Sequence, residues 1–146
     1  MNCLGLQPTN PAFLMLWGIW SGYAFESICL KHIPQIKKAL DIAGIYSVSS
    51  AFYQPPSGEN PGFQIDLLID RKDQVINLFE IKFYNKELSI SREYAAALQH
   101  KINAFANLSK TKKQLFLVMI TAFGVKPNEN SLGLVDRVMV MDELFR

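Results

Sequence analysis

The chain has 146 residues, the size of one domain, and 49% of them are hydrophobic, which excludes intrinsic disorder. With 15 Lys+Arg against 13 Asp+Glu, the net charge is only +2. This small surplus falls short of the strongly basic composition that identifies a nucleic-acid-binding domain. Composition alone therefore names no partner, and function has to be inferred from local patterns.

The N-terminal region carries an apolar run over residues 12–20. No Lys or Arg precedes Lys31, so the basic start of a signal peptide is missing, and the run is too short to span a membrane. Cys3 and Cys29 form neither a disulfide framework nor a zinc motif. We therefore expect a cytoplasmic chain with no membrane partner. It would consist of an N-terminal apolar segment (residues 1–20) and one domain (residues 21–146).

The first half of that domain predicts one helix followed by three strands. Apolar residues at spacings of three and four favour a helix from Gly22 toward Leu40, which Pro34 kinks or restarts. The predicted strands cover residues 46–54, 64–70 and 75–83, with a Pro- and Gly-rich loop over residues 55–62.

A second helix is predicted to begin near Ser91, with a buried face that runs from Tyr94 to Leu108. Two more strands follow over residues 114–120 and 135–141, and then a short terminal turn. The order αβββαββ predicts an α/β fold, with one mixed sheet flanked by helices.

Three charged residues lie inside predicted strands, where charge is disfavoured: Asp66 in one strand, and Glu80 and Lys82 in the next. Burying a charge is costly unless the group is paired or binds a metal. Because side chains alternate along a strand, Glu80 and Lys82 point to the same face. This position favours a functional role over a solvated strand face with a weak surface ion pair.

Whether Asp66 joins them depends on the register of the hairpin. A three-residue loop, residues 72–74, pairs Arg71 with Val75 and therefore places Asp66 directly opposite Glu80. A loop of two or four residues would send the two carboxylates to opposite faces unless a bulge intervenes. We predict the odd register or a compensating bulge.

Two carboxylates beside a lysine are suited to metal-assisted phosphodiester hydrolysis. Mg²⁺ and Mn²⁺ prefer oxygen ligands, and such an ion lowers the pKa of a bound water and neutralises charge on a phosphoryl oxygen. A neighbouring lysine orients the water or stabilises charge in the transition state. The sequence therefore indicates a metal site at Asp66 and Glu80, with Lys82 beside it.

The motifs G-x-x-F-E (Gly22–Glu26), Q-I-D (Gln64–Asp66) and E-I-K (Glu80–Lys82), in this order of elements, carry a family resemblance. The chain resembles the restriction-endonuclease-like PD-(D/E)XK superfamily, and more narrowly the nuclease-like domain at the C-terminus of bacterial and archaeal AAA-type ATPases. The resemblance covers residues 22–145. It departs from the motif at Ile65, which stands where many members have proline.

The resemblance implies that Asp66 and Glu80 are the metal-binding carboxylates and Lys82 is the catalytic lysine. It also implies that Glu26 is the first-helix glutamate that often completes such sites. The implied function is a Mg²⁺- or Mn²⁺-dependent nuclease acting on DNA. From the residues alone, a surface role for Glu26 at the edge of the helix's apolar stripe is equally compatible.

The resemblance also implies partners and rival functions. A homodimer is in keeping with restriction-type nucleases, although the sequence identifies no dimer face. Since the chain has no G-x-x-x-x-G-K-[ST] motif, an AAA-type ATPase would be a separate partner or a former neighbour in a longer chain. The alternative function is a catalytically inactive interaction module of such an ATPase. A weaker alternative is a toxin-like or nucleic-acid-binding domain that does not cleave.

Several other polar and aromatic residues are interpreted without function. Gln99 and Lys101 are predicted to lie on the solvated face of the second helix rather than at a phosphate. The basic cluster Lys110, Lys112 and Lys113 is explained by the helix dipole at a C-terminus. The pair Trp17 and Trp20 is predicted to bury apolar area.

Overall fold

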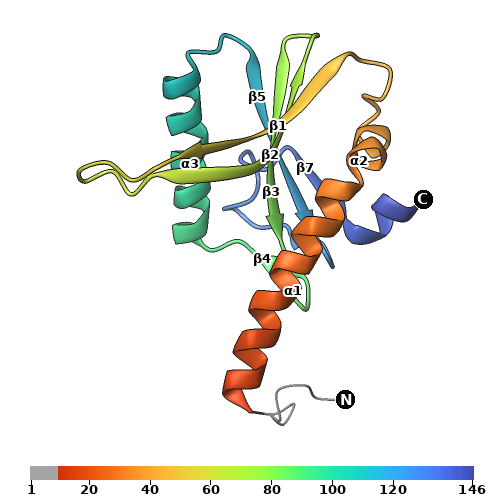
Figure 1. The fold of residues 1–146 in the computed structure, drawn as a ribbon, viewed down its shortest axis with the longest axis vertical. Coiled ribbons are helices and arrows are strands. Elements are labelled where there is room, and N and C mark those ends of the chain that lie inside the picture. Colours follow the sequence, from red (N-terminus) through yellow and green to blue (C-terminus); the bar gives the residue numbers. More distant parts are fainter. Residues whose placement is uncertain (1–9) are drawn as a thin grey trace.

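The computed structural model describes residues 10–146, apart from the side chain of Phe13. It is a mixed α/β fold in which a five-stranded sheet lies between helices (Figure 1), which confirms the predicted class. The helices are α1 (Pro11–Lys31), α2 (Ile33–Ala39), α3 (Arg92–Ser109) and the 3-10 helix η1 (Met141–Phe145). The strands are β1 (Ser47–Gln54), β2 (Phe63–Arg71), β3 (Val75–Lys82), β4 (Leu88–Ser89), β5 (Gln114–Thr121), β6 (Val125–Lys126) and β7 (Arg137–Val140).

The main sheet has the strand order β1-β2-β3-β5-β7. β1, β2 and β3 are antiparallel neighbours, whereas β5 pairs in parallel with both β3 and β7. β4 and β6 form a separate two-stranded parallel sheet, which the sequence did not predict because each strand is only two residues long. The parallel β3–β5 pair requires a long connection, and α3 lies within it.

Both faces of the main sheet are covered. α1, α2 and η1 pack on one face, and their core includes Phe25, Ile36, Phe79 and Leu144. α3 packs on the other face, where Phe105 meets Leu68, Ile76 and Leu78. Figure 1 shows this layering, with α3 on one side of the strands and α1 and α2 on the other. Glu80 and Lys82 alternate with the α1-facing residues of β3, so their backbone positions face α3.

The first helix begins earlier than predicted. α1 starts at Pro11, where the side chain of Asn10 accepts a hydrogen bond from the Ala12 backbone N–H, and it crosses the segment boundary predicted at residue 20. The prediction at Pro34 is confirmed, because α1 ends at Lys31 and α2 restarts with Pro34 in its first turn.

The N-terminal half of α1 projects from the body of the domain (Figure 1). The rings of Trp17 and Trp20 lie 5.3 Å apart, but the two residues remain 53% and 61% exposed. The prediction that this pair buries apolar area is therefore wrong within the described chain. The residues that α1 does bury, among them Phe25 and Cys29, lie in its second half.

Candidate functional site

The β2–β3 hairpin has the register that a three-residue loop predicts. Asp70 pairs with Ile76, and the ladder continues to Leu67 opposite Phe79. The paired residues end there, and one further step of this register would place Asp66 opposite Glu80, as the sequence predicts. On its other side, β2 is irregular at this point, because the β1–β2 register shifts between Ser50 and Phe52.

Glu80 is held by two side chains from α3. The Tyr94 hydroxyl donates a hydrogen bond of 3.0 Å to Glu80 Oε1, and Lys101 Nζ donates one of 2.8 Å to Oε2. The side chain of Glu80 is 14% exposed and that of Lys101 is 27% exposed, so the ion pair is largely shielded from water. Because both carboxylate oxygens are engaged, the orientation of Glu80 is fixed by α3.

Asp66 lies within electrostatic reach of both Glu80 and Glu26. Burial, reinforced by the negative charge of Glu80, raises the pKa of the Asp66 carboxyl, while a 2.8 Å hydrogen bond from Gln64 Nε2 partly opposes this. Burial and the charge of Asp66 likewise raise the pKa of Glu26. The pKa of the Tyr94 hydroxyl is also raised, first by burial and then by the charge of Glu80. The charge of Glu80 therefore acts on Asp66, and the charge of Asp66 acts on Glu26, which places Asp66 between the other two carboxyl groups electrostatically.

Lys82 has a different environment from Lys101. Lys82 is exposed, and its ammonium lies 5.9 Å from the centroid of the Tyr94 ring. Within residues 10–146, Lys82 forms no ion pair. Tyr94 thus connects the two parts of the site, with its hydroxyl on Glu80 and its ring beside the ammonium of Lys82. The charge of Lys82 is left available to a ligand.

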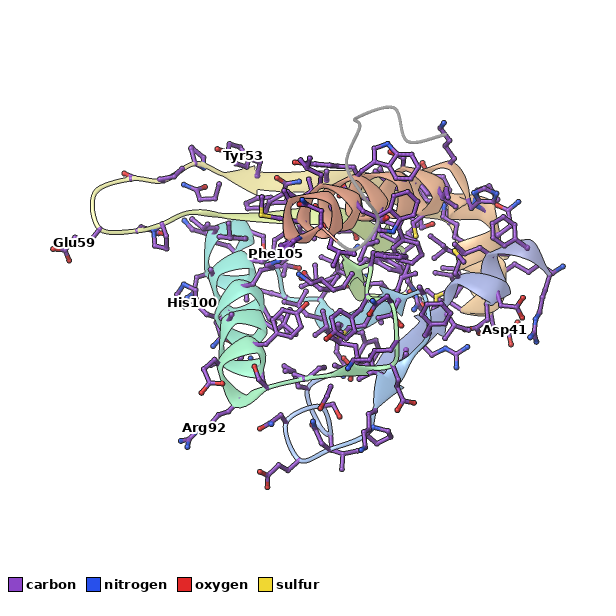
Figure 2. The ribbon with its side chains drawn as sticks, turned by 90° about the horizontal axis from the view of Figure 1, so that it is seen from below. Asp41, Tyr53, Glu59, Arg92, His100 and Phe105 are labelled. Atoms are coloured by element: carbon purple, nitrogen blue, oxygen red, sulfur yellow. The ribbon has the colours of Figure 1, made fainter. Side chains whose placement is uncertain are left out.

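Two surface pockets flank this cluster. One, of about 300 Å³, is lined by Glu26 and Lys82 together with Gly22, Tyr23 and Phe83. The other, of about 490 Å³, is lined by a different set from the hairpin and α3: Phe63, Gln64, Asp66, His100 and Lys101. Figure 2 shows His100 on the outer side of α3 and Phe105 on the side that faces the sheet. Of the four predicted site residues, Glu26, Asp66 and Lys82 therefore border open surface, whereas Glu80 lines neither pocket and lies beneath α3.

The carboxylate oxygens of Asp66, Glu80 and Glu26 are the kind of ligand that a hard divalent cation binds. Carboxylate oxygens are the ligands that Mg²⁺ and Mn²⁺ prefer, and burial, with a smaller contribution from neighbouring negative charge, raises the pKa values of Asp66 and Glu26. In the part of the chain that the structure describes, no group of three or more His, Cys, Asp or Glu side chains is arranged to hold a metal ion. Asp66 and Glu80 are the pair that would hold one, with Glu26 further out.

Two residues of this site were missed or misread in the sequence. Lys101 was assigned to the solvated face of its helix, and this is wrong, because it reaches Glu80. Tyr94 was assigned only to the buried face, without a polar partner. The spacing along the helix could have identified Lys101. It lies three residues after Leu98 and four before Phe105, and Leu98 lies four after Tyr94, so Lys101 falls on the same buried stripe. Gln99 is exposed, as predicted, and its side-chain amide donates a hydrogen bond to Asn103.

The raised pKa of Asp66 gives a prediction for stability. Since the folded chain disfavours ionisation of this carboxyl, its charge destabilises the fold at neutral pH. We expect Asp66→Asn to raise Tm at pH 7 while retaining an oxygen for the Gln64 hydrogen bond. The increase in Tm should shrink as the pH falls through the raised pKa of Asp66. It should vanish below the ordinary Asp pKa of about 3.9. Thermal unfolding between pH 3.5 and 8 measures it.

Asp73→Asn is the matched control with the opposite sign. Hydrogen bonding from Arg71 lowers the pKa of Asp73, so its charge favours the folded state. Its replacement should lower Tm at neutral pH, and the effect should be lost as the pH falls through the lowered pKa. A lower Tm for Asp66→Asn at pH 7 would contradict the electrostatic description of the site.

Comparisons with protein-family models, with curated proteins and with solved structures gave no match to this chain. Among the described helices, none is long and apolar enough to cross a membrane.

Proposed function

We propose that the chain is a Mg²⁺- or Mn²⁺-dependent nuclease domain that hydrolyses phosphodiester bonds in DNA. The observation that carries this proposal is that Asp66 interacts electrostatically with both Glu80 and Glu26, near the ammonium of Lys82, which forms no ion pair within residues 10–146. These are the residues to which the resemblance to the PD-(D/E)XK superfamily assigns metal binding and catalysis. A cytoplasmic location is part of the same proposal.

Each residue has a distinct role in this proposal. Asp66 and Glu80 would hold the metal ion, with the carboxylate of Glu26 further out on α1. When bound, such an ion lowers the pKa of a water molecule and neutralises charge on a phosphoryl oxygen. Lys82 stabilises the charge that develops on the phosphate as it is attacked. Tyr94 fixes Glu80 through its 3.0 Å hydrogen bond and keeps the ammonium of Lys82 on the same side.

DNA is the proposed substrate because the site offers charge suited to phosphates. Lys82 lines one of the pockets, and within residues 10–146 its ammonium forms no ion pair. Phosphate contacts supply most of the sequence-independent affinity of a protein for DNA. With a net charge of only +2, this chain would bind DNA weakly by itself. A partner that delivers the domain to DNA, such as an AAA-type ATPase, would compensate for this.

The test is cleavage of a supercoiled plasmid by the purified chain with Mg²⁺, with Mn²⁺, or with EDTA. We expect nicking that requires the metal and is lost in Glu80→Ala. Glu129→Ala, which changes a carboxylate outside the site, should cleave as the wild type does. Equal cleavage by the wild type and Glu80→Ala would contradict the proposal, since the activity would then come from a contaminant. No cleavage by the wild type with either metal would also contradict it.

A second candidate is a catalytically inactive interaction module of an AAA-type ATPase. The observation in its favour is the exposed apolar surface on α1, which includes Leu14, Met15, Trp17, Ile19 and Trp20. Several large apolar side chains exposed on one helix are typical of protein interaction sites. The plasmid assay separates the candidates, because this module would cleave with neither metal while Trp20→Ala would weaken binding to the ATPase.

A further inference from the structure

The ammonium of Lys101 is bonded to Glu80, the carboxylate to which the proposed function assigns metal binding. Lys101 Nζ lies 2.8 Å from Glu80 Oε2, and Tyr94 takes the other oxygen, Oε1. The ion pair is partly buried and joins α3 to β3. Charge-assisted hydrogen bonds of this kind are among the stronger polar contacts in proteins. A metal ion that binds Glu80 therefore has to compete with a positive charge that is already in place.

We propose that Lys101 is a built-in counter-ion of Glu80 that has to leave this carboxylate before Mg²⁺ or Mn²⁺ binds there. The inference rests on the proposed function, since it assumes that Glu80 is a metal ligand. Lys101 then sets the metal affinity of the domain, because each of the two cations weakens the binding of the other.

The two lysines of the site differ in a way that supports this assignment. Lys82 forms no ion pair within the described chain, and its ammonium is placed against the Tyr94 ring instead. Lys101 is directly bonded to the carboxylate. Removing Lys82 should therefore change metal affinity much less than removing Lys101. A purely structural role for Lys101 predicts the reverse sign, because loss of the contact would free Glu80 to move and weaken metal binding.

The experiment is titration of the metal-free chain with MnCl₂ and MgCl₂ by isothermal calorimetry. We expect Lys101→Met to bind Mn²⁺ about tenfold more tightly than the wild type, the scale of one charge-assisted hydrogen bond. Lys101→Arg retains the charge and should stay near the wild type. Lys112→Met, which removes an exposed lysine near the start of β5, should not change affinity. Circular dichroism establishes that each variant is folded.

If Lys101→Met does not fold, Lys101→Gln replaces it, since the amide retains a donor for Glu80 without the charge, and the same gain is expected. Suppose that the wild type binds Mn²⁺ and that Glu80→Gln does not. Unchanged or weaker Mn²⁺ binding by the uncharged Lys101 variant then overturns this inference but leaves the proposed function standing. Absence of Mn²⁺ and Mg²⁺ binding in the wild type and Lys101→Met alike overturns the inference together with the proposed function. Because calorimetry measures binding, the result does not depend on cleavage activity.

Discussion

Replacing Lys82 by alanine is expected to lower the rate of Mg²⁺-dependent cleavage by about 10²–10³-fold, the loss found when one group that stabilises transition-state charge is removed. The ammonium of Lys82 is exposed and forms no ion pair in the described chain, so its charge is free to act on a substrate. The measurement is single-turnover cleavage of a labelled duplex oligonucleotide at saturating Mg²⁺.

Two further measurements distinguish an effect of Lys82→Ala on the cleavage step from an effect on folding or on metal binding. Lys82→Ala should unfold at the same temperature as the wild type, because the side chain is exposed and makes only a peripheral contact with the Tyr94 ring. Its Mn²⁺ affinity should change far less than that of Lys101→Met. Lys112→Ala is the matched control, since the β3–β5 register places Lys112 near the opposite end of the sheet. A cleavage rate within a few-fold of wild type would remove Lys82 from the mechanism.

The largest effect on stability is expected at Phe79. This residue is 1% exposed and packs in the core beneath α1 and α2, directly opposite Leu67 in the hairpin. Phe79→Ala removes a buried ring and leaves a cavity, which costs about 3–5 kcal/mol of unfolding free energy. Since a domain of this size has about 5–15 kcal/mol in total, much of its stability would be lost.

Urea and thermal unfolding measure this effect. We expect Tm to fall by roughly 6–20 °C, from a dependence of about 2–4 °C per kcal/mol. Phe123→Ala is the matched control, because Phe123 is 58% exposed and its ring is mostly in solvent. A fall of no more than a few degrees for Phe79→Ala would show that the core beneath the site is packed differently. Since Phe79 adjoins Glu80 in β3, metal affinity should also fall where the variant is partly unfolded.

The local parts of the fold were predictable because they depend on neighbouring residues. The register of the hairpin follows from its three-residue loop, and the interruption at Pro34 follows from the missing N–H of proline. The start of α1 was missed, although Asn10 and Pro11 form a standard helix start. The apolar run after Pro11 was treated as a separate segment, and it was considered only as a signal peptide, a membrane span or a surface that packs on the domain or a partner.

The parts that were not predictable depend on contacts between distant elements. The pairing of β3 with β5 joins segments separated by α3, and no local pattern specifies it. The partnership of Lys101 with Glu80 has the same origin, because it exists only when α3 packs on the sheet. A helical wheel places Lys101 on the buried stripe, but it cannot say which carboxylate lies beneath. Glu80 could be assigned to the site from its own strand, whereas its two α3 partners could not.

The parallel pairing of β3 with β5 also has a consequence for the kinetics of folding. The chain has to close the loop that contains β4 and α3 before this pair can form, and non-local pairing of this kind slows folding. The β2–β3 hairpin needs only a short turn and can form earlier. Glu80 would therefore spend the early stage of folding without Tyr94 and Lys101. The ion pair between α3 and β3 can form only after α3 has packed on the sheet, which is when the Glu80 end of the site is assembled.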